Sequence, residues 1–159
     1  MELLAELSGE RGALWGRLRG HSFEEGQGLS FVQRLARERG WSLGFARGAV
    51  EEYRKFCFLA VTGGEACTPS VEVDEVWHLH LIYSRDYWDI WCGQVLRTAL
   101  HHDPTPGGQA ARQRYFAQYA RTLLAYELVF GPPPAAYWPA SHVRFGRGGG
   151  WWRRWGWRG

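Results

Sequence analysis

An amphipathic helix is encoded by the stretch from Ser42 to Val61, SLGFARGAVEEYRKFCFLAV. Its apolar residues recur every three or four positions, which places them on one face of a helix. That face consists of Phe45, Ala49, Val50, Tyr53, Phe56, Cys57 and Ala60. Ser42 can cap the first turn, and two glycines at 63 and 64 end the pattern. The sequence therefore predicts a helix over about 43–61 with one face in the core.

The sequence outside this stretch also follows a helical pattern. Ser30 and Gln33 have the spacing of a capping box at the start of a helix, and Gly40 is expected to end that helix. Residues 71–97 are expected as one long helix, which Ser84 can restart midway. Further helices are expected over 2–19 and 109–130. Because no segment of useful length alternates apolar and polar residues, we expect an all-α, single-domain bundle of about five helices.

The composition changes near the C-terminus. Residues 143–159 hold five arginines, no acidic residue and many glycines and tryptophans, which predicts a disordered low-complexity tail. The formal net charge of the chain is +3, so residues 1–142 keep 14 basic and 16 acidic side chains. We therefore expect a slightly acidic helical domain over 1–142 and a basic tail over 143–159. Weak, salt-sensitive contact with nucleic acid or a membrane surface is expected from the tail alone, and a merely solvated tail is the alternative.

Several classes of protein are disfavoured by composition. The longest clear apolar run is Phe56–Val61, far short of the roughly 18–20 residues of a membrane span. The N-terminus has no basic region before an apolar stretch, so no signal peptide is expected. Three cysteines without metal-ligand spacing do not form a disulfide framework. The expected location is therefore a reducing cytoplasm.

One constellation of residues could carry chemistry. The run VDEVWHLHL over residues 73–81 contains His78 and His80, and a second pair, His101 and His102, follows in the expected loop over 99–108. Imidazole and carboxylate groups together are the ligands that zinc, iron and manganese use in proteins. We therefore expect a divalent transition-metal site. Its candidate ligands are Asp74, His78, His80, His101 and His102.

Helix geometry restricts how these residues can combine. Residues two apart on a helix point about 200° apart, so His78 and His80 cannot share one small site on a regular helix. Asp74 and His78 are four residues apart and share a face. The 99–108 loop would have to fold back over this helix to add a third ligand. The alternative is that these histidines are hydrogen-bonded core residues, with Asp74 orienting His78 or capping the helix.

The sequence gives weaker support for other kinds of functional site. The Glu75-x-x-His78 spacing also occurs in carboxylate di-iron bundles, but a second such pair is missing from the sequence. Cys57 and Cys92 lie among aromatic residues and are expected in the core. If a bound metal supported catalysis, Glu75 or Asp103 could serve as the general base. No reaction or substrate follows from these residues.

Several motifs resemble those of a known family. They are SFVQRLARERGWS at 30–42, TPSVEVDEVWHLHLIYSRDYW at 68–88, LHHDPTPGG at 100–108, and FGPPP with YWP at 130–139. Together they resemble the bacterial branch of the glycine-rich domain-containing protein-like family, whose hallmark is a Trp-His-x-His run, then a tyrosine and a downstream histidine. These positions are Trp77, His78, His80, Tyr83 and His101 or His102. The resemblance implies no defined activity, and it favours a role for the histidines beyond packing.

Two hypotheses of different classes follow. The first is a small metal-binding protein whose site draws on the five candidate ligands. The second is a non-enzymatic interaction module, with a helical body that binds a protein partner and a tail that binds an anionic surface. The sequence does not decide whether the protein is an enzyme.

Overall fold

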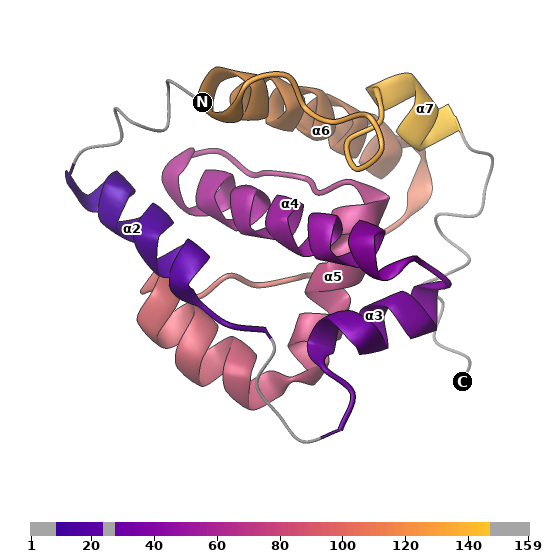
Figure 1. The fold of residues 1–159 in the computed structure, drawn as a ribbon. Helices are drawn as coiled ribbons and strands as arrows, with labels where there is room; N and C mark the ends of the chain where they lie inside the picture. Colours follow the sequence, from indigo (N-terminus) through magenta and orange to yellow (C-terminus); the bar gives the residue numbers. More distant parts are fainter. Residues whose placement is uncertain (1–8, 24–27, 147–159) are drawn as a thin grey trace.

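A computed structural model describes residues 9–23 and 28–146. Within these residues the chain is all-helical, as expected, and forms one bundle (Figure 1). The helices are α2 (Gly9–Gly20), α3 (Phe31–Arg39), α4 (Leu43–Thr62), α5 (Val71–Ile82), the π-helix η1 (Asp86–Leu96), α6 (Gly108–Phe130) and α7 (Ser141–Gly146).

The expectation of about five helices is wrong for the described residues, which form seven. The expected helix over 71–97 is divided, because Tyr83 leaves the helical region at φ −77° and ψ 59°. The chain then resumes as a π-helix, which ends at Arg97 in the left-handed conformation. The short helix α7 follows a proline-rich segment and carries too few residues to show a helical period in the sequence.

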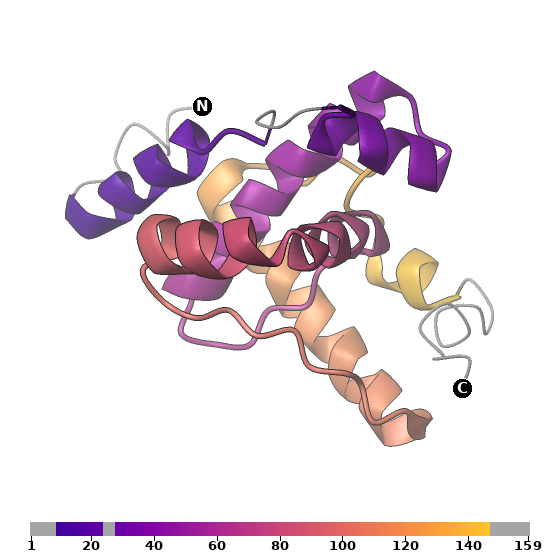
Figure 2. The ribbon, with the colours of Figure 1, turned by 90° about the horizontal axis from the view of Figure 1, so that it is seen from below.

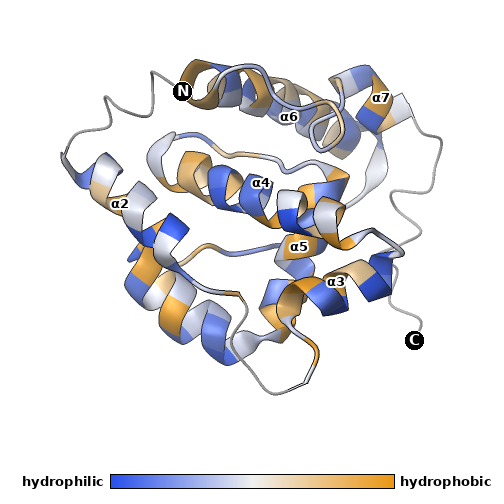
Figure 3. Cartoon of the chain, in the orientation of Figure 1, coloured by the Kyte–Doolittle hydropathy of each residue, from blue (hydrophilic) through white to orange (hydrophobic). Residues whose placement is uncertain are grey.

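Helix α4 lies at the centre of the bundle and packs against α2, α3, α5 and α6 (Figure 1). The predicted helix over 43–61 is confirmed within one residue, and Ser42 caps it by accepting a hydrogen bond from the Phe45 amide. Hydrophobic and hydrophilic residues share each helix, as expected of segments with one buried face (Figure 3). The capping box of Ser30 and Gln33 is also confirmed, and Gly40 ends α3 in the left-handed conformation.

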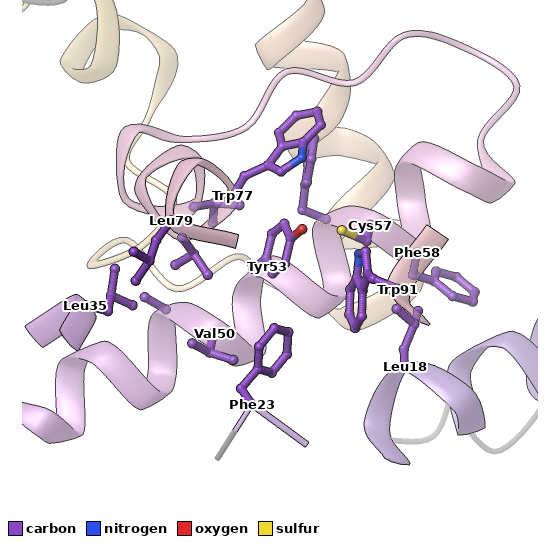
Figure 4. Packing of buried hydrophobic residues seen from close by; sticks show 14 of the residues in the cluster. Leu18, Phe23, Leu35, Val50, Tyr53, Cys57, Phe58, Trp77, Leu79 and Trp91 are labelled. Atoms are coloured by element: carbon purple, nitrogen blue, oxygen red, sulfur yellow. The ribbon is translucent and has the colours of Figure 1, made fainter. Parts of the chain in front are cut away.

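The core around α4 is rich in aromatic rings (Figure 4). Tyr53 of α4 stacks on Trp91 of η1 with ring centroids 5.6 Å apart, and the Phe23 ring lies 5.4 Å from that of Trp91. Cys57 and Cys92 are buried, as predicted. Because aromatic rings from α4, η1 and the segment after α2 interlock, these elements are fixed relative to one another.

A buried carboxylate ties α4 to α6 and to the segment after it. Glu52 is only 5% exposed and accepts hydrogen bonds from the Tyr126 hydroxyl at 2.7 Å and the Trp138 indole at 2.9 Å. Lys55 donates to the other carboxylate oxygen at 2.9 Å. The charge of Glu52 is therefore compensated by one cation and two neutral donors.

The expected boundary between the helical domain and the tail, at residues 142 and 143, falls inside α7. Residues 143–146 belong to α7, and Arg144 is buried, with two guanidinium nitrogens donating to the Pro69 carbonyl at 2.8 and 3.1 Å. The rest of the expected tail, 147–159, lies outside the described residues, as do 1–8. Among the described helices, none is both long and apolar enough to cross a bilayer.

We expect Glu52→Ala to lower the free energy of unfolding by about 3 kcal/mol, because it leaves buried donors of Tyr126 and Trp138 without an acceptor. Urea denaturation followed by circular dichroism measures this loss. The control is Glu38→Ala, which removes an exposed ion pair with Arg34 and should cost less than about 1 kcal/mol. Equal losses in the two variants would contradict a structural role for the Glu52 network.

Candidate metal centre

Helix α5 carries three of the candidate ligands on two different faces. Ser70 begins the helix by accepting a hydrogen bond from the Val73 amide at 3.1 Å. His80 is completely buried, whereas the side chain of His78 is 26% exposed. The expected separation of His78 and His80 on a regular helix therefore holds, and the two rings belong to different clusters.

The first cluster joins α5 to the segment between η1 and α6, which runs as a coil across the bundle in Figure 2. We define the Asp74 cluster as Asp74, His78 and His102. One carboxylate oxygen of Asp74 lies 2.7 Å from His102 Nε2, and the other lies 3.6 Å from His78 Nε2. The two imidazole rings are 4.3 Å apart between centroids. The expected loop does fold back over the helix, and it supplies His102.

Hydrogen bonds in the core fix the position of this segment. The Trp77 indole donates to the Tyr87 hydroxyl at 2.9 Å, and that hydroxyl donates to the Leu100 carbonyl. His102 follows two residues later and packs on the Trp77 ring, with centroids 4.3 Å apart. His102 is therefore positioned by contacts to α5 and η1 rather than by helical structure of its own.

The electrostatics of the Asp74 cluster act in opposite directions on its two histidines. Burial lowers the pKa of His78 to about 4, although the charge of Asp74 opposes this shift. His78 is therefore neutral at pH 7 and offers a nitrogen lone pair. Burial also disfavours a charged His102, but the hydrogen bond and charge of Asp74 outweigh it and raise the pKa of His102. A divalent ion would compete with that proton for His102.

The geometry of the Asp74 cluster is close to that of a metal site. Its three ligand atoms lie within 4.8 Å of one another. Ligands about 2.1 Å from a common ion lie about 3–3.4 Å from each other, so small side-chain movements would complete the site. The side chains are 13–26% exposed, which leaves room for water or a substrate at further coordination positions.

His80 belongs to a second group on the opposite side of α5. We define the His80 cluster as His21, His80 and Asp86. The Nε2 atoms of His80 and His21 lie 2.7 and 3.1 Å from the same oxygen, Oδ2 of Asp86. Burial lowers the pKa of His80, whereas the bonds from both histidines overcome burial and lower the pKa of Asp86. The cluster therefore combines a neutral imidazole with a carboxylate.

The remaining predicted residues lie outside both clusters. His101 is exposed, and its ring lies 5.5 Å from the Trp88 ring. Glu75 is buried and pairs with Arg39 at 2.8 Å, while Asp103 is exposed. No sequence pattern indicated His21 and Asp86 as ligands, because they lie 65 residues apart and no spacing rule joins them.

Comparison with known proteins gives a distant relative. The chain is similar to Glycine-rich domain-containing protein 1 of Arabidopsis thaliana, with 26% identity over 108 residues. The match covers 65% of this chain and 13% of that protein, so this chain corresponds to a small part of the relative. No model of a known protein family matches the chain, and no solved structure matches it.

We expect His102→Ala to lower the free energy of unfolding of the metal-free chain by about 1–2 kcal/mol, because the partly buried Asp74 loses its hydrogen bond and Trp77 loses a ring contact. The adjacent variant His101→Ala removes an exposed imidazole and should change stability by less than about 0.5 kcal/mol. Urea denaturation in the presence of a chelator measures both. A larger loss in His101→Ala would contradict the placement of the two rings.

Proposed function

We propose that this protein binds a divalent transition-metal ion through Asp74, His78 and His102. The observation that carries the proposal is the convergence of two imidazole nitrogens and a carboxylate from α5 and the 97–107 segment. Two histidines and one carboxylate with open positions form the ligand set of non-haem iron sites, and zinc and manganese use the same donors. Of the five ligands expected from sequence, His80 and His101 are left out of this site.

Glycine-rich domain-containing family membership is part of the same proposal. The similarity to the Arabidopsis protein supports it, and we assign the family's domain to residues 1–142. We also infer that the protein belongs to the bacterial branch of this family and that it is located in the cytoplasm. Support for that location comes from Cys57, Cys67 and Cys92, which are all free thiols in the structure.

The proposal leaves the reaction open. The partial exposure of the Asp74 cluster would allow water to complete the coordination shell of the ion, which is the arrangement of catalytic rather than purely structural sites. Asp103 is the better placed of the two expected general bases, because it follows His102 and is exposed. Glu75 is buried against Arg39, so its carboxylate is committed to an ion pair.

We expect the chelator-treated protein to take up zinc at the Asp74 cluster, and the paired variant His78→Ala/His102→Ala to bind one equivalent fewer. Calorimetric titration with Zn²⁺ measures the stoichiometry, and a Co²⁺ titration followed by visible absorption reports the coordination geometry. The matched control is His101→Ala/His142→Ala, which removes two exposed imidazoles. The proposal fails if the paired variant and the parent bind the same number of ions, or if the parent binds none.

A further inference from the structure

The His80 cluster differs from an ordinary hydrogen-bonded histidine in having two imidazoles directed at one oxygen atom. His21 Nε2 and His80 Nε2 both contact Oδ2 of Asp86. The two nitrogens and the oxygen come from three parts of the chain, namely the residue that follows α2, helix α5 and the start of η1. All three ligand atoms lie within 4.8 Å of one another. Three ligands of metal-binding type therefore converge without being neighbours in sequence.

Both imidazole rings are held in place by neighbours. The Nδ1 atom of His80 lies 3.0 Å from the Tyr53 hydroxyl, which leaves Nε2 as the atom directed at Asp86. Metal-ligating histidines have this arrangement, with the second ring nitrogen bonded to a fixed polar group. The His21 ring makes edge contacts with Phe23 at 4.8 Å and with Trp91 at 5.1 Å. The ligands would need little reorganisation to bind an ion.

The histidines of the His80 cluster are more deeply buried than those of the Asp74 cluster. The His80 and His21 side chains are 0% and 6% exposed, whereas Asp86 is 31% exposed. Aromatic rings of Phe23, Tyr87 and Trp91 surround His80. The carboxylate therefore forms the solvent side of an otherwise apolar enclosure. A low dielectric strengthens the attraction between an ion and this carboxylate.

We propose that His21, His80 and Asp86 form a second metal site, which holds a zinc-type divalent ion and fastens the end of α2 to α5 and η1. Each imidazole would supply its Nε2 lone pair, and water would take the position on the exposed side of Asp86. The proton of His80 would move to Nδ1, whose N–H then donates to the Tyr53 oxygen. The site shares no ligand with the one proposed above, so each can be removed by substitution without deleting a ligand of the other.

The test separates the two sites by stoichiometry. We expect chelator-treated parent protein to bind two equivalents of Zn²⁺, and His21→Gln and His102→Ala to bind one equivalent each. His21→Gln is chosen because the amide keeps an N–H donor toward Asp86 while the metal-binding imidazole is lost. His142→Ala, which removes an exposed imidazole, should bind two. Circular dichroism confirms that each variant is folded.

The outcomes discriminate between the proposals. One equivalent in the parent that is lost in His102→Ala but kept in His21→Gln overturns the second site and leaves the first. One equivalent that is lost in His21→Gln but kept in His102→Ala supports the second site and overturns the first. No uptake by the parent overturns both.

A spectroscopic readout assigns the ligands directly. On addition of Zn²⁺, long-range ¹H–¹⁵N spectra should show shifted Nε2 resonances for His21 and His80, with those of His101 and His142 unchanged. Tyr53→Phe should weaken zinc binding at this site about 10–100-fold, because it removes the group that orients His80. An unshifted His80 signal at saturating zinc would overturn the site even if the stoichiometry were two.

Discussion

The hydrogen bond between the Tyr53 hydroxyl and His80 Nδ1 is the contact on which the arrangement of the functional residues depends. A neutral imidazole has one N–H, and the carboxylate of Asp86 can only accept, so the proton lies on Nε2 and Tyr53 donates to Nδ1. This single tautomer links α4 to α5 and then to η1. Because both partners are fully buried, replacing either with an apolar residue would leave the other without its bond.

The same contact also sets the rotation of α5. With His80 directed toward Tyr53 and Asp86, the helix must present Asp74 and His78 on a different side. That side meets the returning segment with His102. The core hydrogen bond thus determines where the partly exposed Asp74 cluster lies. Both metal proposals rest on one orientation of one helix.

Local sequence patterns were enough to predict part of this structure. The apolar spacing over 43–61 predicted α4, and the capping box of Ser30 and Gln33 predicted the start of α3. The four-residue spacing of Asp74 and His78 predicted that they share a face, and the structure brings their side chains together. These features are fixed within one or two helical turns, so a linear pattern contains them.

The features that the sequence did not predict depend on contacts between distant segments. His102, and not His101, lies beside Asp74 because the hydrogen bond of Tyr87 to the Leu100 carbonyl positions this segment. No local sequence pattern predicts that hydrogen bond. The convergence of His21 and Asp86 joins residues 65 positions apart. Ser84 indicated that the helix over 71–97 could restart midway, but the stretch has no proline or glycine there, and no local pattern predicts the break at Tyr83 or the π-helix that begins at Asp86. Tertiary packing overrides helix propensity there.

Each cluster consists of two histidines and one aspartate, but the histidine side chains are more exposed in the Asp74 cluster than in the His80 cluster. We therefore expect the two clusters to have different roles. An ion in the Asp74 cluster would have solvent on its open side, so exchange and substrate access are compatible with its position. An ion in the His80 cluster would lie under aromatic rings, and its binding free energy would add to that of folding, because the unfolded chain does not bring His21, His80 and Asp86 together. A metal ion in the His80 cluster would therefore stabilise the orientation of α5 that brings the residues of the Asp74 cluster together. Because coupling between two binding sites is reciprocal, an ion in the Asp74 cluster would favour the same geometry and strengthen binding at the His80 cluster by the same factor.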